Sequence, residues 1–253
     1  MSFHDLREHY NEVDSTMAVA RQRAQEGAPS GTAIIANAQS KGRGRCDRTW
    51  FSAPNKNLYT TVILHPTPRP DGCAITTAGI VVGVAACLAA QQLGASQAMI
   101  KWPNDIIVNE SKLCGILTEC EDLHSATPTV LVGFGFNVAS AINLSLSDEI
   151  KNLYIGLHDI TGKTDVSVND VFRVVIDSVE KWYNAWLHDG IAPILNTWQQ
   201  LDALYGCEIK AEPVAGSIIA GKADGISKSG ALRVITQYGI KEIIAGDVRR
   251  VHK

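Results

Sequence analysis

The sequence lacks the signals of several broad classes of protein. Its six cysteines form no Cys-x-x-Cys pair and no Cys/His cluster with the spacing of zinc ligands, and such free thiols suit a reducing compartment. The net charge of -3 provides no general attraction to nucleic acid or to an anionic membrane. The polar, charged first residues contain no signal peptide, so we expect a cytoplasmic protein. Any cationic binding site must therefore be a local arrangement.

Long apolar segments are also scarce in this chain. One run, residues 73–90, stays uncharged over eighteen positions, the threshold length of a membrane-spanning helix. The run is rich in alanine and glycine, and neither a Lys/Arg cluster nor an aromatic belt flanks it. We therefore predict a helix buried in a globular core and no membrane span. Within this helix, Gly79 and Gly83 are expected to let a neighbouring backbone approach one face closely.

The hydrophobic pattern predicts an α+β fold. Short runs rich in β-branched residues indicate strands over residues 32–36, 58–64, 98–101, 106–108, 113–119 and 130–138. Because these strands follow one another closely, we expect a mixed or antiparallel sheet backed by helices, not a doubly wound parallel sheet. N-cap oxygens at residues 14–16 predict a first helix that ends at Gly27. Two later helices are predicted over residues 168–188 and 192–204.

The pattern changes near Tyr205. From Gly206 onward, short alternating runs are broken by glycines, which is typical of a small β-barrel of about four or five strands. We therefore predict two domains, residues 1–204 and residues 205–253.

The polar segment over residues 37–57 is long for a loop inside a compact domain, and such loops are usually functional. Three arginines and a lysine fall within the eight residues 41–48. Guanidinium groups suit phosphate or carboxylate oxygens, and the alternating glycines let the backbone turn its N–H groups toward an anion. An RNA-binding Arg-Gly arm is the alternative. The shortness of the segment, its single copy and the few basic residues elsewhere count against it.

Three further segments contain candidate site residues. In residues 101–105, Pro103 stiffens a bend, Asp105 is a candidate magnesium ligand, and an ordinary Pro-Asn-Asp turn is the alternative. Lys112 begins a strand in which Gly115 leaves space beside the backbone, although a lysine at such a place is usually just solvated. The third segment spans residues 132–138 and has two glycines at alternate positions, which clear one face of a buried strand.

Asn137, at the end of that third segment, can both donate to and accept from a purine edge. A lone Gly-x-Gly is weak evidence for a nucleotide site, and neither a dinucleotide-binding fingerprint nor a P-loop accompanies it. Each of these segments alone is therefore a weak to moderate signal.

Together and in this order, the segments resemble those of biotin protein ligases, also called biotin–acetyl-CoA-carboxylase ligases. The family pattern reads Ser-Thr-Asn, GRGRxGRxW, KWPND, KLxGIL and GIGINV. In this chain the corresponding segments are residues 15–17, 42–50, 101–105, 112–117 and 133–138. The resemblance covers essentially the whole chain. It implies a class II synthetase-like mixed sheet backed by helices, followed by a small SH3-like C-terminal β-barrel.

The resemblance also implies an activity. The family uses ATP and Mg²⁺ to convert biotin into biotinyl-5′-AMP, and then transfers biotin to one lysine of a biotin carboxyl carrier protein. The implied biotin-binding residues are Ser15, Thr16, Gln39, Gly42, Arg43, Gly44, Trp50 and Gly115. The implied catalytic cations are Lys112, Arg45 and Arg48. The implied nucleotide contacts are these three cations with Asn104, Asp105 and Asn137, and Asp105 is the implied metal ligand.

Two residues depart from the family pattern. Met17 replaces an asparagine, which removes one polar group near the expected biotin pocket. Asp47 replaces the third loop glycine, and it adds a negative charge between two arginines. Asp tolerates unusual backbone angles better than most residues, so we expect activity to survive. Too few residues precede Ser15 for a helix-turn-helix module, so neither a repressor role nor DNA binding is expected.

Two alternatives remain from the sequence. A lipoate–protein ligase would share the fold and the adenylate chemistry, but the Gly-Arg loop and the Lys-Trp-Pro-Asn-Asp segment favour biotin. A non-catalytic biotin or nucleotide sensor is disfavoured because sensing does not require both Lys112 and Arg45. Family members occur as monomers and as homodimers, and nothing in the sequence decides between the two.

Overall fold

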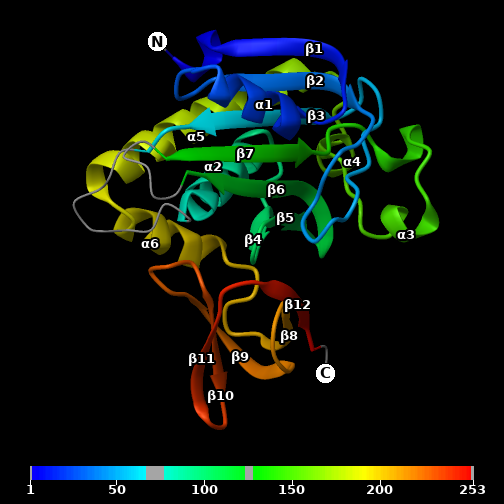
Figure 1. Cartoon of the computed structure of the whole chain (residues 1–253). Helices are drawn as coiled ribbons and strands as arrows, with labels where there is room; N and C mark the ends of the chain where they lie inside the picture. Colours follow the sequence, from blue (N-terminus) through cyan, green and yellow to red (C-terminus); the bar gives the residue numbers. More distant parts are fainter. Residues whose placement is uncertain (1, 67–76, 123–127, 252–253) are drawn as a thin grey trace.

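A seven-stranded sheet forms the centre of the larger part of the molecule in the computed structural model, which describes residues 2–66, 77–122 and 128–251 (Figure 1). In spatial order its strands are β1 (Arg7–Val13), β2 (Ala33–Gln39), β3 (Leu58–Leu64), β7 (Thr129–Phe136), β6 (Ser111–Glu121), β5 (Asp105–Val108) and β4 (Met99–Lys101). β1 and β2 are parallel, and all the other neighbouring strands are antiparallel. The expected mixed sheet is therefore confirmed.

The strand β1 was not predicted from the sequence. Its residues are mostly polar and none of them is buried, because β1 is an edge strand with one face toward solvent. Edge strands accept charged side chains readily, so an apolar pattern is absent there. The central strand β3, in contrast, is buried at every position, and its predicted bounds are those observed.

Helices cover both faces of this sheet (Figure 1). On one face, α2 (Ala78–Gln92) packs against the sheet, α5 (Val168–Asp189) and α6 (Ala192–Leu201). The predicted buried helix is thus confirmed from Ala78 onward, whereas residues 73–76 lie outside the described residues. In the described part of the chain, no helix has the length and apolar character needed to cross a membrane.

The expected close backbone contact at the two glycines of α2 is wrong. A Cβ atom on Gly83 would lie 3.2 Å from Cζ3 of Trp198, and one on Gly79 would lie 3.0 Å from Oγ1 of Thr118. Both glycines therefore make room for the side chains of neighbouring elements, because α2 sits against large residues of α6 and β6.

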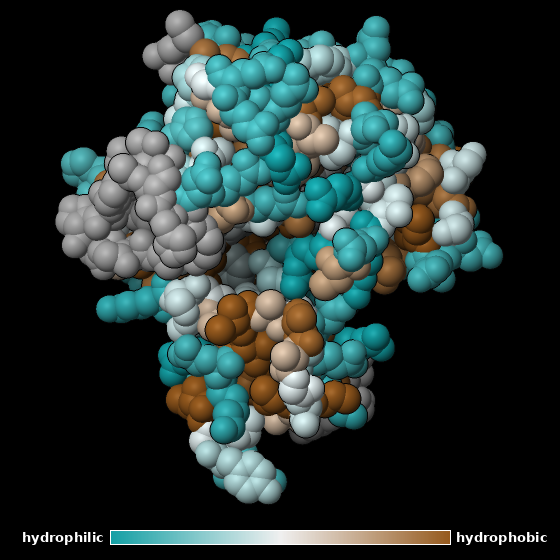
Figure 2. Space-filling view, in the orientation of Figure 1, coloured by the Kyte–Doolittle hydropathy of each residue, from teal (hydrophilic) through white to brown (hydrophobic). Residues whose placement is uncertain are grey.

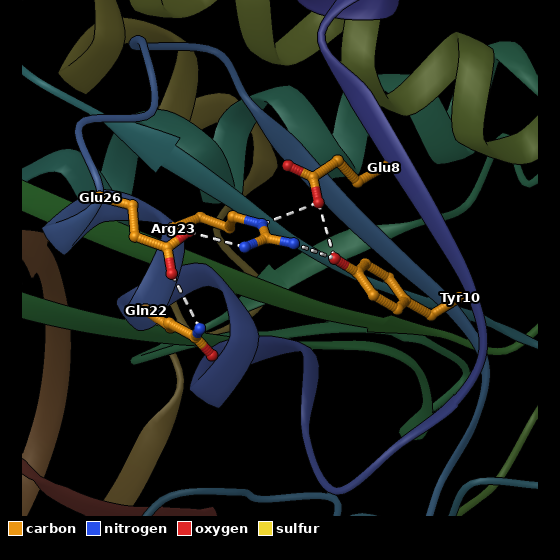
Figure 3. Close-up of polar contacts among 5 residues, drawn as sticks. All are labelled: Glu8, Tyr10, Gln22, Arg23 and Glu26. Atoms are coloured by element: carbon orange, nitrogen blue, oxygen red, sulfur yellow. Dashed lines mark hydrogen bonds and ion pairs between the residues drawn. The ribbon is translucent and has the colours of Figure 1, made fainter.

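On the opposite face, α1 (Thr16–Gln25) packs on the sheet through a small apolar cluster. Its buried members are Met17, Ala20, Ile34, Ile63 and Leu131. The guanidinium of Arg23 fixes the C-terminal end of this helix to β1 (Figure 3). It donates to Glu8 at 2.9 Å, to Glu26 at 2.6 Å and to the Tyr10 hydroxyl at 3.0 Å. These contacts hold the C-terminal end of α1 beside β1.

Residues 139–165 connect the sheet to α5, and their helical segments are all short. These are η3 (Ala141–Asn143), α3 (Asp148–Lys151) and α4 (Leu157–Thr161). The long helix α5 then begins with a capping box, in which Ser167 and Asp170 each bond the other's backbone N–H.

A second sheet lies below the first in Figure 1. Its strands, in spatial order, are β11 (Gly239–Ile243), β10 (Leu232–Thr236), β9 (Ile219–Ile226), β8 (Glu208–Pro213) and β12 (Gly246–Arg250). All neighbouring pairs are antiparallel, which agrees with an SH3-like domain. Apolar side chains gather on the face of this part seen in Figure 2. The boundary between residues 204 and 205 stays a prediction.

Candidate active site

A cavity of about 740 Å³ opens between the larger sheet, the Gly-Arg loop and the C-terminal sheet. This volume is within the range of ordinary ligand pockets. The structure brings together the predicted site residues, because all of them except Gly42 line the cavity. They come from segments more than a hundred residues apart in sequence, and the fold alone makes them neighbours.

One end of the cavity is polar and closed. The side-chain oxygen of Gln39, the last residue of β2, accepts hydrogen bonds from the backbone N–H and the hydroxyl of Thr16 at 2.9 and 3.2 Å. The buried hydroxyl of Thr61 donates to the Thr16 hydroxyl at 2.8 Å. Ser15 stands at the N-cap position but makes no side-chain capping bond, contrary to expectation. The start of α1 is instead anchored by Gln39, which the tertiary fold places beside it.

Glycines form the floor of the cavity. Gly115 of β6 pairs with Gly135 of β7, and the indole of Trp50 lies directly over both. A Cβ atom on Gly135 would lie 2.2 Å from Cε2 of Trp50, and one on Gly115 would lie 2.7 Å from Cζ3. The expected cleared face therefore exists, and in this structure a loop tryptophan covers it.

Lys112 is not a solvated lysine at a strand start. Its ammonium nitrogen lies 2.7 Å from Oδ1 of Asp105 and 5.1 Å from the centroid of the Trp50 ring. Its backbone is also held, because its N–H donates to Leu153 at 2.6 Å and its carbonyl accepts from the side chain of Asn137 at 2.9 Å. Lys112 is thus a positioned cation at the junction of the glycine floor and the carboxylate.

The two other predicted cations approach from the loop. Arg45 donates to the side-chain oxygen of Asn104 at 3.2 Å and to the carbonyl of Gly246 at 3.5 Å. Arg48 forms an ion pair with Asp247. Both contacts with residues 246 and 247 join the loop to β12, so the C-terminal sheet helps to close the cavity.

The loop itself is a short hairpin. The carbonyl of Gly42 accepts from the N–H of Trp50 at 2.9 Å, and the N–H of Gly44 donates to the carbonyl of Arg48 at 2.7 Å. A Cβ atom on Gly42 would lie 2.6 Å from the Trp50 carbonyl, so this glycine closes the hairpin and does not line the cavity. At the tip, Asp47 has a φ of 56°, in the region that favours glycine. The departure from the family pattern thus falls where a glycine is conformationally preferred.

Several cavity residues were missed by the sequence analysis. They are Met17, Phe51, Thr61, Trp102, Ile107, Glu110, Ile116, Leu117, Phe134, Glu149, Ile150, Leu153, Tyr154, Asp247, Val248 and Arg249. Four of them, Trp102, Ile116, Leu117 and Phe134, lie within the motif segments but are apolar, so their chemistry did not single them out. Glu149, Ile150, Leu153 and Tyr154 lie in or after α3, where no motif occurs. Asp247, Val248 and Arg249 of β12 were missed because they belong to the other sheet. Met17 was noted as a departure from the family pattern, but it was not predicted to be a site residue.

The potential for metal binding rests on Asp105. Across the described ranges, which omit residues 67–76 and 123–127, no group of three or more His, Cys, Asp or Glu residues is arranged to hold a metal ion. Magnesium in nucleotide sites is commonly held by one or two carboxylates together with substrate phosphates. Asp105 lines the cavity beside Lys112, and its role as a metal ligand stays a prediction.

Comparisons with known proteins agree with this geometry. Residues 10–137 match the model of the biotin/lipoate A/B protein ligase family. The chain is 31% identical to the biotin–acetyl-CoA-carboxylase ligase of Paracoccus denitrificans, covering 93% of this chain and 97% of that protein. It is also 31% identical to the bifunctional ligase/repressor BirA of Bacillus subtilis, covering 95% of this chain and 72% of that longer protein.

The fold is similar to a solved ligase structure. The biotin protein ligase from Aquifex aeolicus in complex with biotin and ATP superposes with a TM-score of 0.82 at 28% identity, over 97% of this chain and 99% of that chain. The agreement in sequence, in fold and in the residues that line the cavity has one explanation: this chain belongs to the biotin/lipoate A/B protein ligase family.

Proposed function

We propose that this chain is a biotin protein ligase. It joins biotin to ATP to form biotinyl-5′-AMP and pyrophosphate, and then transfers the biotinyl group to one lysine of a biotin carboxyl carrier protein. The observation that carries the proposal is the convergence of Lys112, Arg45 and Arg48 on one cavity with a polar closed end and a glycine floor. The names of the Paracoccus and Aquifex relatives, which are biotin ligases, support the same substrate.

The polar end of the cavity suits the ureido head of biotin. Thr16 and Gln39 are hydrogen-bonded to each other, and Thr61 fixes the Thr16 hydroxyl from behind. A pre-oriented polar cluster rejects ligands that leave its groups unpaired. Because the dithiolane head of lipoate offers no N–H donor, this cluster favours biotin over lipoate. Ser15 is proposed to contact the same head group, since it lines that end of the cavity.

In the first step, a carboxylate oxygen of biotin attacks the α-phosphorus of ATP. A P–O bond forms, and the bond to the β-phosphate oxygen breaks, which releases pyrophosphate. Both reactants are anions, so the step requires positive charge at one point. We assign Lys112 to the biotin carboxylate and the α-phosphate. Arg45 and Arg48 are assigned to phosphate oxygens, and they exchange their present partners Asn104 and Asp247 for the nucleotide.

Magnesium neutralises part of the triphosphate charge when it is bound. Asp105 would hold it together with phosphate oxygens, and Asn104 would support this arrangement from the adjacent position. Asp105 now pairs with Lys112 at 2.7 Å, so its carboxylate already lies beside the cation assigned to the same phosphate. Asn137 fixes the backbone of Lys112 and is proposed to lie near the adenine.

In the second step, the neutral amine of the carrier lysine attacks the carbonyl carbon of the mixed anhydride. A C–N bond forms, AMP leaves with the electrons of the C–O bond, and the amine loses a proton. The anhydride must be protected from water until then. The hairpin of residues 42–50, with Gly42, Arg43 and Gly44 in its first leg, is proposed to cover the ligand while Trp50 packs beside its ring system.

The test is biotin transfer from ATP to a purified carrier domain, detected by a streptavidin blot. Wild-type protein should show biotin-dependent exchange of pyrophosphate into ATP and should label the carrier only when ATP and magnesium are present. Lys112→Ala and Arg45→Ala should fail at the exchange step. Absence of exchange by the folded wild type would overturn the proposed function. A non-catalytic sensor would bind biotin but would neither exchange pyrophosphate nor label the carrier.

Lipoate is the control substrate. Thermal stabilisation by biotin and none by lipoate supports the assignment, and stabilisation by lipoate alone would replace it with a lipoate ligase. We further propose a cytoplasmic location, no role in nucleic-acid binding and a monomeric or homodimeric state, all of which stay predictions.

A further inference from the structure

Glu119 of β6 contacts the Gly-Arg loop from outside the cavity. Side chains alternate along a strand, so Gly115, Leu117 and Glu119 share one face of β6. The first two line the cavity, and Glu119 lies two residues farther along the same face, outside the cavity lining. Its Oε1 lies 3.1 Å from the guanidinium of Arg43, the first arginine of the loop.

The other oxygen of Glu119 has a separate partner. Oε2 forms an ion pair with Arg21 of α1, and Arg21 also pairs with Glu121 two residues farther along β6. The Glu119 side chain is only 22% exposed, and each of its two oxygens pairs with a different guanidinium group. Its carboxylate is therefore oriented before the loop arrives, which reduces the entropy lost when Arg43 binds.

The ion pair between Arg43 and Glu119 restrains both legs of the hairpin of residues 42–50. Arg43 is bridged to Thr49 across the two legs, and the neighbouring Gly42 is bonded to Trp50. A tether on Arg43 thus also restrains Trp50 on the glycine floor. The Arg43 guanidinium is thus directed to Glu119, whereas Arg45 contacts Asn104 and Arg48 contacts Asp247.

We propose that Glu119 is a positioning residue that holds the loop closed over the cavity through Arg43. The arginines of the loop then have two functions, because Arg43 fastens the loop and Arg45 with Arg48 bind the nucleotide. The inference rests on the proposed function for its kinetic effects, but closure of the ligand-free loop can be measured without any catalysis.

The experiment compares Glu119→Gln with Glu121→Gln. Both variants remove one carboxylate that pairs with Arg21, but only Glu119 contacts the loop in the described structure, so Glu121→Gln is the matched control. Trypsin cleavage after the arginines of the free loop should accelerate about fivefold in Glu119→Gln, the order expected from losing one partly exposed ion pair, and less than twofold in the control.

The kinetic measurement follows the bound intermediate. Biotinyl-5′-AMP should dissociate about fivefold faster from Glu119→Gln and the KM for biotin should rise, while kcat for its formation changes little. Arg43→Gln should change the dissociation rate of the intermediate and the KM for biotin to the same extent. The double variant should release the intermediate no faster than either single variant. Because Arg43 lies in the loop, this variant also tests the pair if Glu119→Gln fails to fold.

Equal cleavage of Glu119→Gln and Glu121→Gln, or additive effects of Glu119→Gln and Arg43→Gln on intermediate release, would overturn the proposal. If the wild type forms no intermediate, the proposed function fails, and the trypsin comparison still decides whether Glu119 fastens the loop.

Discussion

The ammonium nitrogen of Lys112 lies 2.7 Å from Oδ1 of Asp105, so the cation proposed for catalysis is paired with the carboxylate proposed for magnesium. The pair is about one-third exposed at both side chains, and the Lys112 nitrogen lies over the ring of Trp50. When ATP and magnesium enter, each partner can exchange the other for a substrate charge. Substitution of Lys112 and substitution of Asp105 should therefore change different kinetic parameters.

Lys112→Ala should reduce the rate of biotinyl-5′-AMP formation at least about a hundredfold, because removal of a group that stabilises developing charge typically has that effect. Asp105→Asn should instead raise the magnesium concentration needed for half-maximal rate and leave the KM for biotin nearly unchanged. Pyrophosphate exchange at varied magnesium measures both. An unaltered magnesium dependence in Asp105→Asn would remove Asp105 from the metal site.

Gly135→Ala should weaken biotin binding more than tenfold. The new methyl group would lie 2.2 Å from Cε2 of Trp50, so the indole and with it the loop must move away from the floor. Gly133→Ala on the same strand is the comparison variant. Its methyl group would lie 3.0 Å from the end of the flexible Met17 side chain and in ordinary contact with Oγ1 of Thr61 at 3.5 Å and the Leu117 carbonyl at 3.7 Å, so a smaller loss of affinity is expected. Calorimetric titration with biotin compares the two, and equal losses of affinity would contradict this account of the floor.

Asp47→Gly and Asp47→Asn separate backbone conformation from charge at the tip of the loop. Asp47 has a φ of 56° and stands between two arginines assigned to phosphate. Both substitutions remove the negative charge and tolerate this φ, so both should lower the KM for ATP by about twofold to fivefold, as expected for one exposed charge. If Gly alone has this effect, backbone conformation and not charge limits ATP binding.

Met17→Asn should tighten biotin binding and destabilise the free protein. Met17 is 3% exposed and belongs to the apolar cluster under α1, where an amide without full hydrogen bonding costs about 1–3 kcal/mol. At the polar end of the cavity the same amide would add a contact to biotin. Thermal unfolding should give a lower Tm without ligand and a larger shift with biotin. A reduced shift with biotin would count against the proposed placement of the head group.

Asp202→Asn should stabilise the protein at neutral pH. Asp202 follows α6 and is 6% exposed, and burial raises the pKa of its carboxyl group. Between the unfolded pKa, about 4, and the raised folded pKa, the folded state binds more protons than the unfolded state. Stability contributed by protonated Asp202 is therefore lost as the pH rises through that window. Hydrogen bonds to the carboxylate, first that from the Leu204 N–H, oppose the shift by lowering the pKa, and the charge of Arg250 adds to this effect.

The Asn variant should accordingly unfold at the same temperature as wild type near pH 3.5 and at a higher temperature at pH 7. It retains an acceptor for the N–H of Leu204, which now donates to Asp202 at 2.8 Å. Denaturant unfolding across this pH range measures the difference. A constant difference between the two proteins at all pH values would show that Asp202 does not titrate with folding.

The sequence by itself determined the features that depend on local chemistry. The buried strand at Leu58–Leu64 and the long helix from Val168 were predicted correctly. A strand buried on both faces has a continuous apolar run, and a helix buried on one face has apolar residues with a 3.6-residue period. The Gly-Arg segment was predicted to be a loop over the site, and most of its residues do line the cavity. Anion binding by its guanidinium groups stays a prediction.

Only the tertiary structure decided which residues become partners. Nothing near Arg48 in sequence indicates Asp247, and nothing near Arg43 indicates Glu119, because both carboxylates come from other strands. The edge strand β1 was missed because its side chains face solvent. Ser15 is the N-cap of α1, but it makes no side-chain capping bond, and Gln39 of β2 accepts from the Thr16 N–H instead. Local sequence preference determines whether a segment forms a helix, a strand or a loop. The tertiary fold determines which charged side chains from distant segments become ion-pair partners.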